Sequence, residues 1–172
     1  MTMSAITRGW HLARTGRFQD AAQQMERATA VMHQSKAYSP RPLLVSTFTD
    51  VYLMAGQIDE GLQLFHKESE EYPINGERFM ESEIRRLHGE LLLAKKDSQQ
   101  AEQEFQLALK IARQQEAKSL ELRAGMSLAR LWQSELKTRE AHQMLSEIYN
   151  WFTEGFDTPD LIEAKTLLEA VS

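Results

Sequence analysis

Residues Thr49–Phe65, TDVYLMAGQIDEGLQLF, hold the pattern that decides the fold. A small residue is followed by a bulky apolar one three positions later, and a second small residue is followed by a bulky one four positions later. The pattern recurs along the chain with a period of 40 residues. The four series are Gly9, Thr49, Gly89 and Ala129; Leu12, Tyr52, Leu92 and Trp132; Ala21, Gly61, Ala101 and Ala141; and Met25, Phe65, Phe105 and Leu145. Such self-similarity is typical of solenoids, whose stacked units bury a continuous core.

Each unit is expected to form two helices, because apolar residues recur at i, i+3, i+4 and i+7 spacing. The short connections imply that successive helices pack antiparallel. Gly16 and Gly56 suit the left-handed conformation that ends a helix, whereas Lys96 and Leu136 stand at the equivalent positions and leave those turns open. The expected helices are 3–14, 18–36, 42–55, 58–72, 78–95, 98–115, 119–135, 138–152 and 159–171.

The pattern matches the tetratricopeptide signature, in which Gly-x-x-aromatic is followed by Ala-x-x-x-Phe. The second unit matches best, because Thr49–Tyr52 and Gly61–Phe65 are followed by Pro73. The period exceeds the ordinary repeat of about 34 residues, which lengthens the helices and connections by about one and a half turns. The predicted fold is an all-α, tetratricopeptide-like α-α superhelix of four helical hairpins plus a C-terminal capping helix.

We expect a single domain over residues 1–172. Its units are predicted at about 2–41, 42–81, 82–121 and 122–156, with the capping helix at 158–171. The aromatic cluster before that helix is interpreted as part of the cap, since a repeat array must cover its last apolar face. In this interpretation Trp151 and Phe152 anchor the last repeat, and Phe156 pins the loop; a binding role for the cluster is the alternative.

Three runs carry a resemblance to a known family. The runs RRLHGELLLA at 85–94, AKSLELRAGMSLARLWQ at 117–133 and YNWFTEGFDTPDLIEAKTLLE at 149–169 resemble the C-terminal repeat region of bacterial multidomain regulators. Those regulators join a nucleotide-cyclase-type or DNA-binding domain to a P-loop ATPase and then to repeats. The resemblance covers about residues 83–170 and continues more weakly, in register, over 6–72. It implies a regulatory or assembly role and supplies no catalytic residues in this region.

Composition narrows the classes of function. The chain has no cysteine, which excludes disulfides and thiolate metal sites. Its net charge of −5 argues against a nucleic-acid partner. No apolar run approaches the roughly 20 residues that span a bilayer, and the first 16 residues lack an apolar signal core. A cytoplasmic protein that binds neither nucleic acid nor membrane is expected.

Motifs for catalysis and metal binding are missing from the sequence. No histidine pair has i, i+4 spacing, and neither H-E-x-x-H nor the P-loop motif G-x-x-x-x-G-K-[ST] occurs. The nucleophile motif G-x-S-x-G does not occur either. His88 is expected to serve in packing or capping. We therefore predict that the chain is not an enzyme and uses no cofactor and no metal.

The concave groove is the predicted binding surface, since the first helix of each unit lines the groove in tetratricopeptide arrays. The residues expected there are Trp10, Arg14, Asp50, Glu83, Arg86, Glu90, Arg123 and Arg130. Arg86, Arg123 and Arg130 can converge on a carboxylate or phosphate. The equal alternative is that Glu83 and Glu90 pair with these arginines internally.

Two hypotheses of function follow. The first is a non-catalytic protein-interaction scaffold, a regulatory or assembly module of a bacterial signalling or transcription system that binds a protein or peptide. The alternative is a sensing arm that binds the anionic group of a ligand or peptide in the groove. No capping helix is expected before Ile6 and Trp10, so either the chain belongs to a larger protein or a homodimer covers this edge.

Overall fold

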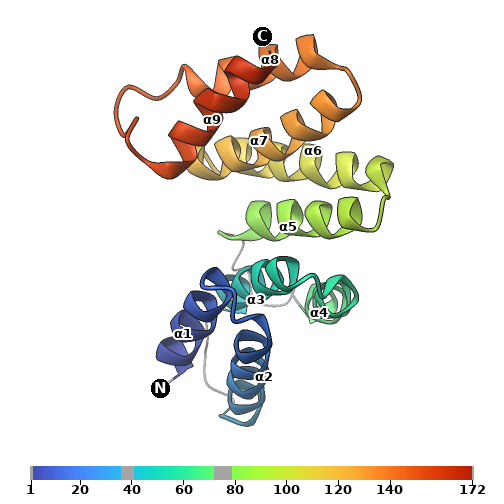
Figure 1. Cartoon of the computed structure of the whole chain (residues 1–172), viewed down its shortest axis with the longest axis vertical. Helices are drawn as coiled ribbons and strands as arrows, with labels where there is room; N and C mark the ends of the chain where they lie inside the picture. The colour runs from blue at the N-terminus through green and yellow to red at the C-terminus, as the bar shows by residue number, and fades with distance from the viewer. Residues whose placement is uncertain (1, 36–40, 72–78, 172) are drawn as a thin grey trace. The chain divides into compact units, whose positions relative to one another are not determined.

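The computed structural model describes residues 2–35, 41–71 and 79–171, and all regular secondary structure in these ranges is α-helical (Figure 1). The helices are α1 (Thr2–Arg14), α2 (Phe18–Ser35), α3 (Arg41–Ala55), α4 (Ile58–Glu71), α5 (Glu81–Ala94), α6 (Ser98–Gln114), α7 (Lys118–Ser134), α8 (Thr138–Tyr149) and α9 (Pro159–Ala170). Their bounds lie within three residues of those predicted, so apolar periodicity and turn residues located the helices.

The chain divides into two compact units, Met1–Met80 and Glu81–Ser172. Helices α1 to α4 belong to the first unit, and α5 to α9 belong to the second. The division falls at the predicted boundary between the second and third repeats. The single domain over 1–172 stays a prediction.

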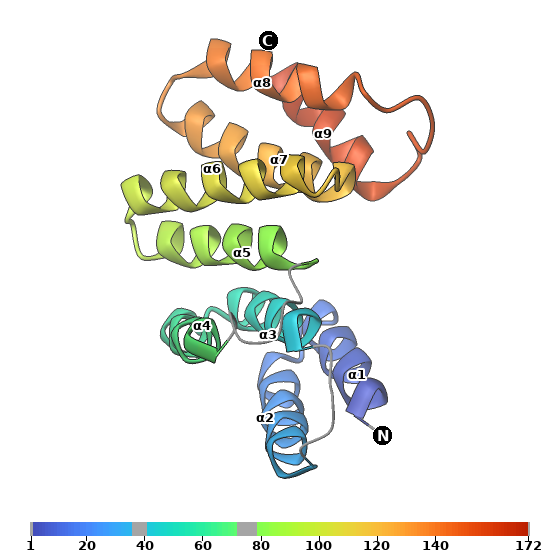
Figure 2. The same cartoon turned by 180° about the vertical axis from the view of Figure 1, so that it is seen from behind.

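In the second unit the helices pack as successive antiparallel hairpins, which can be followed from both sides in Figures 1 and 2. The two helices of each hairpin contact one another: α1 with α2, α3 with α4, α5 with α6 and α7 with α8. First helices also stack on the next first helix, as α1 does on α3, α5 on α7, and α7 on α9. This order of contacts is the one predicted for tetratricopeptide-like hairpins.

The four hairpin turns share one backbone geometry. Positions 16, 56, 96 and 136 all have positive φ, with values of 80°, 69°, 67° and 62°. At each turn the following N–H donates to a carbonyl five residues back, for example Lys137 N to Trp132 O at 2.8 Å. This is the Schellman pattern that closes a helix end. Lys96 and Leu136 therefore adopt the left-handed conformation without glycine, and the turns that the sequence left open are resolved.

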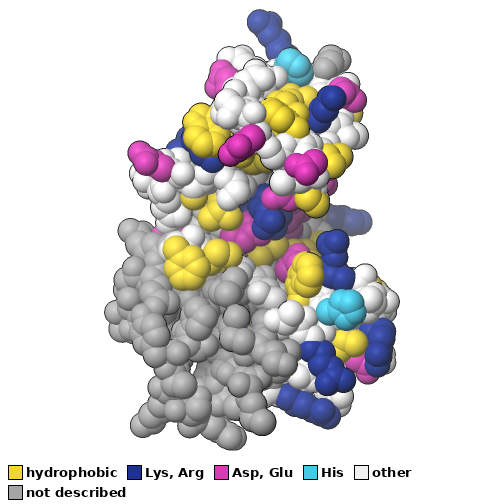
Figure 3. All heavy atoms as spheres, turned by 90° about the vertical axis from the view of Figure 1, so that its left-hand side faces the viewer, with side chains coloured by type: hydrophobic (Ala, Val, Ile, Leu, Met, Phe, Trp, Pro, Cys, Tyr) yellow, Lys and Arg dark blue, Asp and Glu magenta, His cyan; other side chains and the backbone are white. Residues whose placement is uncertain are grey.

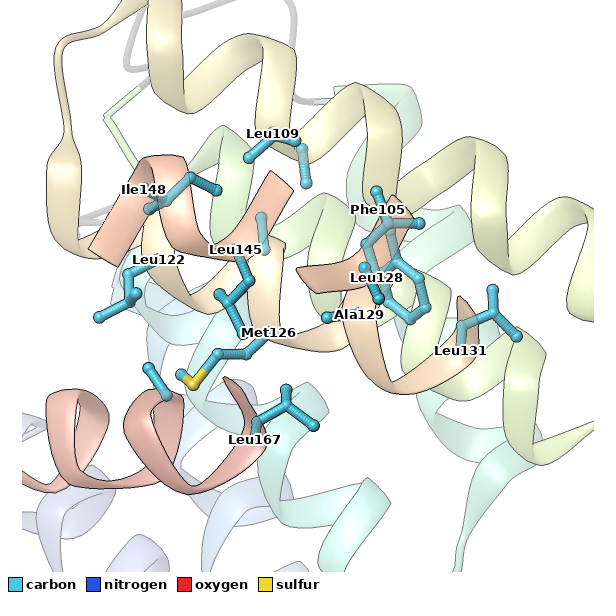
Figure 4. Packing of buried hydrophobic residues seen from close by; sticks show 14 of the residues in the cluster. Phe105, Leu109, Leu122, Met126, Leu128, Ala129, Leu131, Leu145, Ile148 and Leu167 are labelled. Atoms are coloured by element: carbon cyan, nitrogen blue, oxygen red, sulfur yellow. The ribbon is translucent and has the colours of Figure 1, made fainter. Parts of the chain in front are cut away.

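Close helix contacts explain the alternation of small and bulky residues. A Cβ atom at Gly89 would lie 2.5 Å from Cε1 of Phe105, and one at Gly9 would lie 2.9 Å from Cε of Met25. A side chain at either glycine would overlap its neighbour, so the small residue lets the bulky residue of the return helix pack against the first helix. Figure 4 shows Phe105 among the buried apolar side chains of the second unit.

The C-terminal end differs from the prediction at one residue. Phe152 packs against the core, as expected, but the Trp151 side chain is 57% exposed. Helix α8 ends at Tyr149 and the chain turns away, so the Trp151 ring lies edge-on to Phe152 at 5.2 Å, and Nζ of Lys118 lies 5.4 Å from the indole ring. The prediction that Trp151 anchors the last repeat was wrong.

Candidate protein-interaction surface

The predicted binding residues lie on first helices of both units. Trp10 and Arg14 are on α1 and Asp50 is on α3, all in the first unit. The second unit holds the other five on two helices: Glu83, Arg86 and Glu90 on α5, and Arg123 and Arg130 on α7. Side-chain contacts join the residues of each unit into a cluster, and we describe the two clusters in turn.

In the first unit, Trp10 is fixed at the surface between two stacked helices. Its indole Nε1 donates a hydrogen bond to Oδ2 of Asp50, 3.1 Å away and 40 residues later in the chain. The Arg14 guanidinium lies 5.3 Å from the centre of the indole ring, within cation–π range. The Trp10 side chain is nevertheless 40% exposed. These contacts present a tryptophan face to solvent with its orientation already set.

In the second unit, Arg86 lies at the centre of an ion-pair network on α5. Its Nε and Nη2 donate to the two carboxylate oxygens of the buried Glu83 at 3.0 and 2.9 Å. Its Nη1 also lies 3.3 Å from Oε1 of Glu90, one turn further along the helix. Bidentate pairs of this kind are the strong form of arginine–carboxylate contact.

Helices α7 and α9 extend the same network. The Ser127 hydroxyl donates to Oε1 of Glu90 at 2.6 Å. Arg123 joins three helices, because its Nη1 lies 3.5 Å from Glu83 and its Nε donates to Asp160 of α9 at 2.7 Å. Burial alone lowers the pKa of Arg123, but the hydrogen bond to Asp160 and the charge of Glu83 outweigh it and raise the pKa.

The last predicted arginine, Arg130, donates from Nη2 to Glu163 of α9. Each of the three arginines thus faces at least one carboxylate. The three arginines and the four carboxylates that they face carry a formal charge of 3 − 4 = −1. Of the two alternatives open at the sequence level, the contacts favour internal pairing. A site in which Arg86, Arg123 and Arg130 converge on an anion is not formed.

Sequence reasoning missed the partners that α9 supplies. Asp160 and Glu163 lie on a helix interpreted only as a cap, although Glu163 follows Arg123 by one full period of 40 residues. Treating α9 as a further first helix in the same register would have placed both carboxylates beside α7. The missed signal was therefore the period itself, continued into the cap.

A contact between the buried His88 and the half-buried Glu104 joins α5 to α6. The buried His88 has its Nδ1 3.3 Å from Oε1 of Glu104, and Arg85 Nη1 donates to the same carboxylate at 3.3 Å. Burial alone raises the pKa of Glu104, but the contacts with His88 and Arg85 outweigh it and hold the pKa below its ordinary range. The packing role predicted for His88 agrees with this position.

Figure 3 shows that charges of both signs are interspersed on the face of the second unit. Dark blue and magenta groups adjoin one another in the upper part of the view, with apolar groups between them. Among the described residues, no three histidine, aspartate or glutamate side chains gather as a metal-binding group. Over the same residues, none of the helices is both long and apolar enough to cross a bilayer. The face in Figure 3 is thus one of mixed polarity.

Comparison with known proteins gives a structural likeness only. No protein-family model matches the chain, and no curated protein matches it. Two crystal structures of the nearly identical TPR-like repeats of a putative kinesin light chain from Podosopora anserina, one of them a substituted variant, match with TM-scores of 0.75 and 0.72. Each is 16% identical and is matched over 98% of this chain and 84% of its own. Such a likeness shows the fold: the chain is an all-α, tetratricopeptide-like repeat protein.

Proposed function

We propose that the chain is a non-catalytic protein-interaction module, and that the surface of first helices around Trp10 contacts its partner. Repeat proteins of this architecture generally bind other proteins through extended surfaces of this kind. By the resemblance of residues 83–170 to the repeat region of bacterial multidomain regulators, the module serves regulation or assembly in a signalling or transcription system.

The fixed, half-exposed Trp10 is the observation that carries this proposal. Tryptophan and arginine are the residues most enriched where binding energy concentrates in interfaces. Trp10 and Arg14 stand together, and the hydrogen bond to Asp50 holds the indole in one orientation before any partner arrives. A side chain that is already ordered loses little conformational entropy on binding.

The alternative function, sensing of an anionic ligand, loses its main support. It required unpaired arginines, but Arg86, Arg123 and Arg130 each face carboxylates, and these arginines and carboxylates together carry a net charge of −1. An incoming anion would have to displace these carboxylates. We therefore prefer a protein partner to a phosphate- or carboxylate-bearing ligand.

The test uses two matched exposed aromatic residues. Trp10 on the first helix α1 is 40% exposed, and Phe18 on the return helix α2 is 38% exposed. Tagged wild-type, Trp10→Ala and Phe18→Ala chains are used to capture partners from cells of the source organism. We expect Trp10→Ala to lose the partner about tenfold or more, as at an interface hot spot, and Phe18→Ala to retain it. Equal capture by both variants, with both folded by circular dichroism, would remove the first-helix surface as the binding site.

Self-association through the first repeat is a separate proposal about the same unit. It predicts a dimer mass by light scattering that dissociates on dilution. A constant monomer mass over the concentration range would contradict it without affecting the proposed binding of another protein.

A further inference from the structure

Helix α9 repeats the register of the first helix α7. Ala164, Leu168 and Val171 stand one period of 40 residues after Ala124, Leu128 and Leu131 and face the core as those residues do. Helix α9 also packs on α7, as each earlier first helix does on its neighbour within its unit. By register and packing, α9 is a further first helix rather than an unrelated cap.

The face of α7 that receives its return helix α8 is made of small residues. A Cβ atom at Gly125 would lie 2.7 Å from Cδ1 of Ile148, and Ala129 is fully buried in the same core. The equivalent positions of α9 are Lys165 and Glu169, and both are exposed. Within the described ranges neither charge has an ion-pair partner. This face of α9 therefore corresponds to a helix-binding face, but its two central positions carry opposite charges four residues apart.

A groove of about 520 Å³ lies along this face. It is lined by Tyr149, Phe156, Ile162, Lys165, Thr166 and Glu169. Phe156 and Ile162 are 47% and 53% exposed, and the Phe156 ring lies 5.8 Å from that of Tyr149. The groove thus has an apolar end beside a charged end, which matches one face of an amphipathic helix.

We infer that this groove binds an amphipathic helix of a partner protein, in the place that α8 occupies on α7. The helix carries a bulky apolar residue against Phe156 and Ile162, with a basic residue facing Glu169 and an acidic residue facing Lys165. Complementary charge is what selects this occupant, because a helix with a wholly apolar contact face, such as the face that α8 packs on α7, would bury Lys165 and Glu169 without partners. This surface is distinct from the one around Trp10, and the inference does not depend on the proposed function.

The chain itself supplies a probe for the test. A synthetic peptide of residues 135–152 reproduces α8 with its flanking turns. In the period of the repeats Leu145 is the bulky residue matched to position 129, and Ile148 contacts position 125. A peptide carrying Leu145→Lys and Ile148→Glu therefore places a basic residue opposite Glu169 and an acidic residue opposite Lys165. Binding of this peptide to the full chain is measured by fluorescence anisotropy of a label on the peptide.

We expect saturable binding that weakens about tenfold in Ile162→Ser and about fivefold or more in Glu169→Lys, typical of one anchor and one charge contact. The charge-swapped pair, a peptide carrying Leu145→Glu and Ile148→Glu with the Glu169→Lys chain, should recover the binding. Leu107→Ser on α6 is the matched control, since Leu107 is also an exposed aliphatic residue, and it should bind as the wild type does.

Absent binding, or binding that Ile162→Ser and Glu169→Lys leave unchanged, would overturn the inference. So would failure of the charge swap to recover binding. Light scattering tests the other occupant, because a dimer that Ile162→Ser dissociates would assign the groove to a second copy of this chain. None of these variants alters Trp10, so their outcome is separate from that of the Trp10→Ala experiment.

Discussion

At the scale of single residues, the spacing between first and return helices depends on a few small side chains. Gly89 faces the rigid ring of Phe105, and Gly125 faces the terminal methyl of Ile148. A Cβ atom added at these two glycines would lie at similar distances from its nearest neighbour, 2.5 and 2.7 Å, but the neighbours differ in how readily they move. The ring cannot yield without moving the core, whereas a terminal methyl can rotate away.

Gly89→Ala should therefore destabilise the protein by up to about 2 kcal/mol, since overpacking costs about 1–3 kcal/mol and the better helix propensity of alanine returns about 1 kcal/mol. Gly125→Ala should change stability by less than about 0.5 kcal/mol, because the same gain offsets a smaller overlap. Urea unfolding of both variants measures the difference. A Gly89→Ala protein as stable as the Gly125→Ala protein would show that the ring can move aside. If the overlap with the Phe105 ring is the cause, the double variant Gly89→Ala, Phe105→Leu should lose less stability than the sum of the losses in the two single variants.

At the scale of elements, the junction between α6 and α7 is held by a buried carboxylate. Glu121 accepts a hydrogen bond from Nε of Arg113 at 2.8 Å and another from Nζ of Lys118 at 2.7 Å. Its side chain is only 5% exposed. Burial alone raises the pKa of Glu121, but the hydrogen bonds from Lys118 and Arg113 outweigh it, so the pKa lies below its ordinary value of 4.5.

A carboxyl group with a lowered pKa in the folded state stabilises the protein above its unfolded pKa and loses that contribution as the pH falls through the folded pKa. Glu121→Gln should cost about 1–2 kcal/mol near pH 7, because it removes the charge that accepts both hydrogen bonds. The cost is no larger because Arg113 and Lys118 are partly exposed to solvent. The stability gap between wild type and variant should narrow as the pH falls below 4.5. Urea unfolding near pH 7 and below pH 4.5 measures the gap. The control is Glu140→Gln, because Glu140 is exposed. A gap that is independent of pH would mean that the charge of Glu121 does not stabilise this junction.

At the scale of the whole molecule, the chain forms two compact units with separate apolar clusters. One cluster contains Met25, Phe48 and Val51, and the other contains Phe105, Leu128 and Leu145. In repeat proteins each unit depends mainly on its neighbours, so stability need not be uniform along the chain.

Gly89→Ala should consequently accelerate amide hydrogen exchange in α5 to α9 and leave exchange in α1 to α4 unchanged. Hydrogen exchange followed by mass spectrometry of peptides from both units measures this, with Gly125→Ala as the matched variant. Equal acceleration in both units would instead support one cooperative domain over 1–172.

The sequence by itself determined the helices of the described residues and their pairing into hairpins, because apolar periodicity and turn residues act within a few positions of the chain. The turns at Lys96 and Leu136 fall at the positions that the period predicts, but only the structure showed their positive φ, since neither residue favours it. The predicted first-helix surface also needed only the repeat register to place its residues on first helices.

Only the tertiary structure decided how the charged residues of that surface are used. The contacts of Arg123 with Glu83 and Asp160 span 40 and 37 residues of the sequence, and those of Arg86 and Glu90 with Ser127 span 41 and 37. Each depends on the distance between stacked helices and on side-chain direction, which no local pattern fixes. The tertiary structure likewise separated Phe152, packed against the core, from the exposed Trp151 beside it. Because α8 ends at Tyr149, Trp151 lies in solvent while Phe152 lies against the core. The position of this helix end depends on packing rather than on local sequence.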